Sequence, residues 1–205
     1  MCNHVVDVSE HQGKMNWARA ANAGVCLAIT RVTLGAGKVD ARFAENQKGI
    51  LDQGIRWGGY HVFRPEVSGT DQAYFFRDVL LVAGGFEPYL VALDVEVNAS
   101  GVSKAKFWEN LLVCAITLDE CFRGKVMVYT NKYFWNRNVG SAPWPMGRLW
   151  IANYTTAPKP GLPYSWTDWS LWQYSANGNK RGGEFGAESW DIDLSRASFR
   201  LAVTA

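Results

Sequence analysis

The sequence lacks several features that would place it in other classes of protein. None of its 205 residues belongs to a run of ~20 uninterrupted apolar residues, so membrane insertion is not expected. The first residues lack the basic and long apolar regions of a secretory signal. Lys and Arg number 21 and Asp and Glu 19, without a basic cluster, which argues against nucleic acid as a partner. We therefore expect a soluble protein that does not bind nucleic acid.

Cysteine is scarce, and metal or phosphate motifs are missing. Cys2, Cys26, Cys114 and Cys121 show no Cys-x-x-Cys spacing, so we expect free thiols and neither a zinc site nor a redox pair. The G-x-S-x-G, P-loop and H-E-x-x-H motifs do not occur. His61 has no partner at a metal-ligand spacing, which favours a hydrogen-bonded structural histidine. No metal or cofactor is predicted.

Aromatic residues, in contrast, are plentiful. The chain has 10 Trp, 8 Tyr and 10 Phe. Most of the tryptophans fall in the last third, at Trp135, Trp144, Trp150, Trp166, Trp169, Trp172 and Trp190. This is more than a core of this size readily holds, so we expect some of them to line a binding surface.

Eight short apolar, β-branched runs have the length and composition of strands buried on both faces. They are Val5–Val8, Leu27–Val32, Trp57–Phe63, Leu90–Val95, Lys125–Thr130, Arg148–Ala152, Ser170–Tyr174 and Ile192–Leu194. Helical spacing of apolar residues occupies the first four gaps, over Asn16–Ala23, Ala41–Gln53, Asp71–Val82 and Ser103–Cys121. Alternating strands and helices with short joints predict parallel pairing of the first five strands.

The second part of the chain differs from this pattern. From Asn131 onward the gaps are shorter and rich in Pro, Gly, Trp and Asn, which leaves little room for crossover helices. Eight strands with about five helices indicate an α/β fold, an irregular TIM-like barrel, in one domain over residues 1–205. An open doubly wound sheet has the same local signals and is the alternative.

Acidic residues occur at the ends of several of these strands. In the run from Val91 to Val97, alternation places Asp94 and Glu96 on one face of an otherwise apolar strand. Asp7 ends the first strand and Asp193 lies in the last. Because the first and eighth strands of a closed barrel are neighbours, we expect all four acids to meet at its C-terminal rim, where barrel enzymes place their chemistry.

Neighbouring acids in an apolar setting are costly, since burial and mutual repulsion both disfavour the second charge. One member of the pair is expected to keep its proton near neutral pH while the other is ionised, a combination that suits cleavage of a glycosidic bond. The alternative for each acid is a structural one, capping a helix or binding Arg.

Several motifs, in order along nearly the whole chain, resemble those of the family 25 glycoside hydrolases, the Chalaropsis-type lysozymes. They are Asp7-Val8-Ser9-Glu10-His11-Gln12-Gly13, Gly59-Tyr60-His61-Val62-Phe63-Arg64-Pro65, Leu93-Asp94-Val95-Glu96, Val128-Tyr129-Thr130, Leu149-Trp150-Ile151-Ala152-Asn153-Tyr154, Trp172-Gln173-Tyr174-Ser175 and Ile192-Asp193-Leu194. The resemblance implies a (β/α)5(β)3 barrel with β-1,4-N-acetylmuramidase activity on bacterial peptidoglycan. Because the chain shows no internal repeat or linker, we expect no separate cell-wall-binding module.

The resemblance also implies roles for individual residues. Glu96 matches the proton donor, and Asp7, Asp94 and Asp193 match the other three catalytic acids. The substrate-binding positions implied are Arg31, Tyr60, Tyr129, Trp150 and Gln173. The family usually has K-A-[ST]-E-G after the second strand, whereas this chain has Arg31-Val32-Thr33-Leu34-Gly35, with Leu34 in place of the acid. This departure concerns substrate preference, because the four acids are kept.

The sequence is also compatible with two functional alternatives, a catalytically silent glycan-binding barrel and a transglycosylase. For hydrolysis, retention of configuration is favoured, either with a carboxylate nucleophile or with Asp94 orienting the 2-acetamido group of the substrate. The expected setting is a monomeric phage endolysin held in the host cytoplasm until lysis, when it reaches the cell wall. A secreted bacterial enzyme is the alternative.

Overall fold

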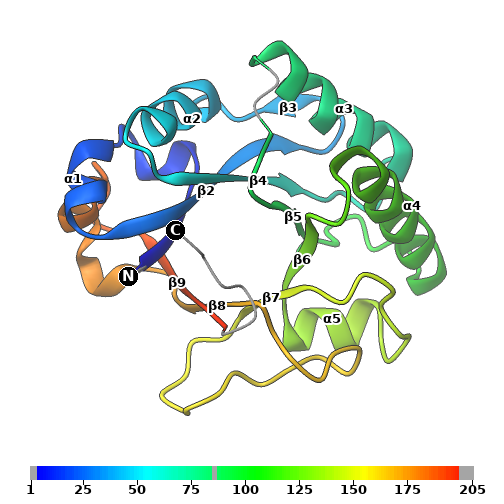
Figure 1. The fold of residues 1–205 in the computed structure, drawn as a ribbon. Coiled ribbons are helices and arrows are strands. Elements are labelled where there is room, and N and C mark those ends of the chain that lie inside the picture. Colours follow the sequence, from blue (N-terminus) through cyan, green and yellow to red (C-terminus); the bar gives the residue numbers. More distant parts are fainter. Residues whose placement is uncertain (1–3, 85–86, 199–205) are drawn as a thin grey trace.

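One nine-stranded sheet dominates the computed structural model, which describes residues 4–84 and 87–198. Its strands are β1 (His4–Val8), β2 (Val25–Leu34), β3 (Lys38–Val39), β4 (Arg56–Val62), β5 (Val91–Asp94), β6 (Val126–Asn131), β7 (Leu149–Ala152), β8 (Leu171–Ser175) and β9 (Asp193–Ala197). The order is β1-β9-β8-β7-β6-β5-β4-β2-β3, and β1 also pairs with β2. That pairing closes an eight-stranded barrel, with β3 as a hairpin partner of β2 (Figure 1). The barrel prediction is confirmed, and the open sheet is excluded.

Helices pack around the outside of the barrel (Figure 1). They are α1 (Trp17–Asn22), α2 (Phe43–Asp52), α3 (Gly69–Val82), α4 (Lys104–Phe122) and α5 (Lys132–Asn138). The first four lie where apolar spacing predicted them. The short α5 occupies a gap in which we expected little room for a helix. It begins because the Asn131 side chain accepts a hydrogen bond from the Phe134 N–H at 2.9 Å, which caps the first turn.

The last strand runs against its neighbours. β9 is antiparallel to both β1 and β8, whereas β1, β2 and β4 to β8 pair in parallel. Within the described residues, the short turns η1 (Glu10–Gln12), η2 (Gly178–Lys180) and η3 (Gly182–Phe185) supplement the helices, and the last two lie between β8 and β9. Because that connection does not recross the barrel, β9 starts at the rim where the parallel strands end.

The interior of the barrel and the layer beneath the helices form two separate apolar cores. Residues of alternating strand positions fill the interior, namely Val5, Leu27, Ile29, Leu90, Ala92, Met127, Tyr129, Trp150, Ala152 and Leu171. Their neighbours along the strands, such as Val6 and Ala28, pack outward against the helices. Asp7 and Asp94 stand two residues beyond Val5 and Ala92, so the same alternation turns both carboxyl groups inward at the rim.

Most of the late tryptophans are buried in the outer core or the barrel interior. Trp135, Trp144 and Trp166 form a buried cluster with ring centroids 4.5–6.3 Å apart, beside α5. The indole of Trp150 faces the barrel interior, while Trp190 is 77% exposed. The outer core between strands and loops therefore holds more indole rings than composition suggested.

Two smaller expectations were also tested. Cys26 is disulfide-bonded, so the prediction of free thiols is wrong for this residue, whereas Cys114 and Cys121 are free. Cys2 lies outside the described residues. No helix within residues 4–84 and 87–198 is long and apolar enough to cross a membrane.

Candidate active site

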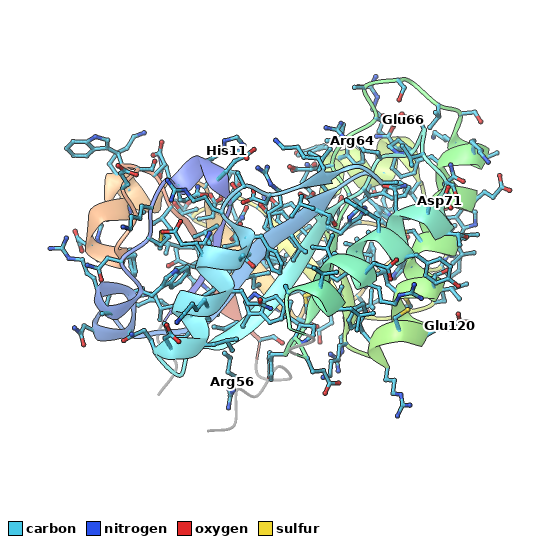
Figure 2. The ribbon with its side chains drawn as sticks, turned by 90° about the horizontal axis from the view of Figure 1, so that it is seen from above. His11, Arg56, Arg64, Glu66, Asp71 and Glu120 are labelled. Carbon is cyan, nitrogen blue, oxygen red and sulfur yellow. The ribbon has the colours of Figure 1, made fainter. Side chains whose placement is uncertain are left out.

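The rim formed by the C-terminal ends of the parallel strands carries a polar pocket. Figure 2 shows the barrel from the side, with His11 and Arg64 at this rim and Arg56 at the opposite end. The pocket has a volume of about 230 Å³. It is lined by Asp7, Tyr60, Asp94, Glu96, Tyr129, Trp150, Tyr154, Gln173, Ala176 and Asp193. Residues from seven strands and three loops thus converge on one cavity.

Four carboxyl groups share this pocket. Asp7 and Asp193 are direct cross-strand partners on β1 and β9. Asp94 is the last residue of β5, and Glu96 follows two residues later at the more exposed mouth of the pocket. Asp94 Oδ1 is buried and has no hydrogen-bond partner among the described residues. The pocket therefore offers at least one acceptor that is not used within the described protein.

Burial raises the pKa values of all four acids, and repulsion from neighbouring acids adds to this effect at Asp7, Asp94 and Asp193. Burial, followed by the charge of Asp193, raises the pKa of Asp7 well above its usual range, although a hydrogen bond from Gln173 opposes this. Burial and then the charge of Glu96 do the same to the pKa of Asp94. Partial desolvation raises the pKa of Glu96, and that of Asp193 reaches about 7, mainly through burial. The cluster therefore holds protons near neutral pH.

A hydrogen-bond network joins the acids to the aromatic wall of the pocket. The amide nitrogen of Gln173 donates to both carboxylate oxygens of Asp7, at 3.1 and 3.0 Å. The Gln173 Oε1 accepts from the hydroxyl groups of Tyr129, at 2.9 Å, and Tyr154, at 2.7 Å. Trp150 packs edge-on against Tyr129, with ring centroids 4.7 Å apart, and its indole N–H donates to Ser195 Oγ at 3.0 Å. These contacts fix the pocket wall before any substrate enters.

Comparison with known proteins identifies the family. The sequence model of the family described as glycosyl hydrolases family 25 matches residues 6–183, which is most of the chain. This chain belongs to glycosyl hydrolase family 25. Lysozyme M1 of Streptomyces globisporus is 30% identical over 213 residues, covering 93% of this chain and 66% of that protein. The chain spans between 52% and 66% of the length of the curated relatives it matches.

Solved structures of a lysozyme and of an endolysin have the same fold. The bacterial lysozyme of Streptomyces coelicolor superimposes with a TM-score of 0.81 at 29% identity, covering 97% of this chain and 93% of that one. The catalytic domain of a Listeria monocytogenes bacteriophage endolysin has a TM-score of 0.76 at 22% identity, covering 98% and 95%. At that identity the endolysin is informative about the fold alone.

Within this family 25 barrel, the structure brings together all four acids named from the sequence. Four of the five expected substrate-binding residues, Tyr60, Tyr129, Trp150 and Gln173, also line the pocket. Arg31 does not. Its Nε donates to Asp40 Oδ2 and its Nη2 to Glu10 Oε1, each at 2.7 Å.

The carboxylates that bind Arg31 come from outside its own strand. Asp40, whose side chain is fully buried, and Glu10 supply the carboxylates that hold the guanidinium. Arg31 still acts on the pocket at a distance, since its charge lowers the pKa values of Asp94 and Tyr60 against the opposing effect of burial.

Two lining residues escaped the sequence prediction, Tyr154 and Ala176. Tyr154 is 56% exposed and lies two residues past β7, where no strand periodicity indicates its direction. Its place in the Asn153-Tyr154 motif was the available signal. Ala176 offers no chemical signal of its own.

His61 has the structural role expected of it. It is buried on β4, with Nδ1 2.7 Å from Thr33 Oγ1 and Nε2 3.2 Å from Gln72 Oε1. Burial lowers the pKa of His61 to about 4. No group of three or more His, Cys, Asp or Glu side chains suited to a metal ion occurs in the described part of the chain.

Proposed function

We propose that this chain is a β-1,4-N-acetylmuramidase, which hydrolyses the bond between N-acetylmuramic acid and N-acetylglucosamine in peptidoglycan. The observation that carries the proposal is the convergence of Asp7, Asp94, Glu96 and Asp193 in one pocket of a family 25 barrel. Lysozyme M1, a relative by sequence, is named as a lysozyme. The aromatic wall provides apolar surface for sugar rings.

Glu96 is the proposed general acid. It lies at the mouth of the pocket, where a glycan strand has access, and its raised pKa keeps a proton available at a pH at which a free glutamate is ionised. Its proton goes to the bridging oxygen as the bond to the anomeric carbon breaks. The ionised carboxylates in the pocket stabilise the positive charge that develops on the sugar ring.

Asp94 is the proposed partner of the 2-acetamido group. Its Oδ1 is buried in the pocket without a partner among the described residues, and an acetamido N–H would provide the missing donor. In that arrangement the acetamido oxygen attacks the anomeric carbon and water then opens the intermediate, so configuration is retained. NMR of fresh products checks this, because an α-configured first product would exclude retention.

Mass spectrometry of purified cell walls after digestion tests the activity. Fragments with N-acetylmuramic acid at the reducing end are expected, and replacement of Glu96 by Gln is expected to reduce their release by roughly 10²- to 10⁴-fold. Glu66→Gln is the matched control, because Glu66 is exposed at the same rim but outside the pocket.

Three outcomes would contradict the proposal. Walls that bind the protein without being dissolved would indicate a silent glycan-binding barrel. Anhydro-ended fragments would indicate a transglycosylase. Fragments ending in N-acetylglucosamine would indicate a glucosaminidase.

We further propose that the protein acts as a monomer and as a phage endolysin, stored in the host cytoplasm and released to the wall at lysis. The occurrence of this fold in a Listeria phage endolysin is compatible with such a role. Because disulfides form poorly in a reducing cytoplasm, the disulfide at Cys26 makes a clear test possible. Wall digestion should persist in excess dithiothreitol, and expression should lyse a host only after its membrane is permeabilised. Loss of activity on reduction would favour a secreted enzyme.

A further inference from the structure

The side chain of Gln173 occupies the centre of the pocket network. It lies on β8, is 2% exposed, and contacts Asp7, Tyr129 and Tyr154. The carbonyl oxygen has two lone pairs, and two hydroxyl groups use both. The amide nitrogen is directed at the two oxygens of Asp7. Little of its hydrogen-bonding capacity is left for a substrate.

The direction of these hydrogen bonds follows from Asp7. An inverted amide would place Oε1 against both carboxyl oxygens of Asp7, which could supply at most one proton to two short oxygen–oxygen contacts. The nitrogen must therefore face Asp7, and Oε1 must face the tyrosines. Since Oε1 cannot donate, the hydroxyl groups of Tyr129 and Tyr154 must both donate their hydrogen bonds to it.

We infer that Gln173 is a positioning residue, whose amide holds Asp7 in place and directs the hydroxyl protons of two pocket tyrosines toward itself. The phenol oxygens of Tyr129 and Tyr154 then offer only lone pairs to the pocket. A substrate group that contacts them must be a donor, which a sugar hydroxyl or an acetamido N–H can be. The identity of the substrate in this inference rests on the proposed function. The hydrogen-bond network itself is independent of that function.

Asp7 provides a readout that needs no substrate. Its carboxyl group faces titratable groups from several elements, namely Asp193 of β9, Asp94 of β5, Tyr60 of β4, Tyr129 of β6 and Tyr154 beyond β7. The adjacent β2 adds Arg31, which is held by Glu10 and Asp40. Among the groups that act on Asp7, Gln173 lowers its pKa, whereas burial and the neighbouring acids raise it.

The first experiment follows the Asp7 carboxyl carbon by ¹³C NMR during a pH titration, with Asp7→Asn used for assignment. Gln173→Met keeps a side chain of similar length but removes the amide. We expect the Asp7 midpoint to rise by roughly one pH unit, as for the loss of one hydrogen bond to a charged group. An unchanged midpoint in a folded variant would overturn the inference. Should Gln173→Met not fold, Gln173→Asn, which is too short to keep all contacts, undergoes the same titration.

The second experiment is a double-mutant cycle on soluble peptidoglycan fragments. Tyr154→Phe removes one acceptor and is expected to raise KM several-fold with a smaller effect on kcat. Gln173→Met is expected to lower kcat/KM by roughly 10- to 100-fold, since misplaced pocket groups are costly. If Gln173 orients Tyr154, adding Tyr154→Phe to Gln173→Met has little further effect on KM. Fully additive effects would contradict the inference.

The two experiments separate this inference from the proposed function. A chain without muramidase activity would refute the proposed function, while the Asp7 titration would still report on Gln173. Both proposals would be supported if the Asp7 midpoint rises in Gln173→Met, the parent digests peptidoglycan and Glu96→Gln is inactive.

Discussion

Asp7 and Asp193 stand directly opposite each other on the antiparallel strands β1 and β9. Asp7 is buried and Asp193 half-buried, and both line the same pocket. Two carboxyl groups that face each other in one pocket cannot both ionise without a large cost in free energy. The pair therefore retains a proton to a higher pH than either residue alone would. The closure of the barrel is what makes this pair.

Replacing Asp193 by Asn should stabilise the protein in a pH-dependent way. The pKa of Asp193 is raised from 3.8 to about 7, so the folded protein keeps a proton that the unfolded chain releases between these values. The free energy of unfolding of the parent therefore falls as pH rises through this window. Asp193→Asn removes that loss, and its stability relative to the parent should increase from pH 4 to pH 7 and then level off.

Urea denaturation at several pH values measures this difference. Asp71→Asn is the control, because Asp71 is exposed on α3, away from the pocket. A difference between Asp193→Asn and the parent that does not vary with pH would show that the pair does not share a proton as described.

His61 should be neutral, with its proton on Nε2, throughout the physiological range. The Gln72 oxygen is identified by the Arg64 N–H that donates to it at 2.7 Å, so His61 Nε2 must donate to that oxygen and Nδ1 must accept from Thr33. Because the pKa of His61 is lowered to about 4, its contribution to stability is present above pH 6.5 and is lost as pH falls through 4.

Two-dimensional ¹⁵N NMR of the imidazole ring checks this assignment. Nε2 should have the chemical shift of a protonated nitrogen at pH 6, and Nδ1 that of an acceptor. A ring that titrates near pH 6.5, or one with its proton on Nδ1, would contradict the hydrogen-bond assignment.

Gly49→Ala should destabilise the packing of α1 on α2. A Cβ at Gly49 would lie 2.2 Å from Cδ1 of the buried Trp17, so the indole or a helix must move. Such overpacking typically costs about 1–3 kcal/mol, against a gain of about 1 kcal/mol in helix propensity. We expect a net loss of up to about 2 kcal/mol in thermal or urea unfolding. Gly37→Ala, which meets no atom within 4 Å, should change stability by less than about 0.5 kcal/mol.

Arg31 should be important for stability. Its removal in Arg31→Ala leaves the buried carboxylate of Asp40 without a cation, which costs about 3–5 kcal/mol. Arg31→Lys keeps the charge but cannot bind Asp40 and Glu10 with a planar fork, so an intermediate loss is expected.

Urea denaturation compares these variants with Lys48→Ala, which breaks an exposed i,i+4 pair with Asp52 and should cost less than about 0.5 kcal/mol. Equal losses for Arg31→Ala and Lys48→Ala would show that Asp40 does not depend on the guanidinium.

The local pattern of apolar and polar residues was sufficient to predict most strands and helices and to select the four acids of the pocket. Apolar runs predicted all eight barrel strands, because a strand buried on both faces needs apolar residues at successive positions. Alternation predicted that Asp94 and Glu96 share a side, and both line the pocket. Helical spacing located α1 to α4, whereas α5 is short and begins at a polar cap rather than at an apolar stripe.

The local sequence pattern could not predict which side chains contact one another in the folded protein. The number of tryptophans is visible in the sequence, and it led us to expect some of them at a binding surface. Their packing against one another is not visible in the sequence. Arg31 was expected in the pocket, and it turns to Asp40, nine residues away, because that buried carboxylate needs a cation. The central role of Gln173 depends on three groups that approach it from three different segments.

The sequence by itself determined where the strands lie and which side chains share one face of a strand, since a strand has a two-residue period. Only the tertiary structure decided which of these side chains meet. The antiparallel entry of β9 and its register against β1 bring Asp193 to Asp7 from 186 positions along the chain. Register between distant strands arises from closing the barrel, and no local period in the sequence encodes it.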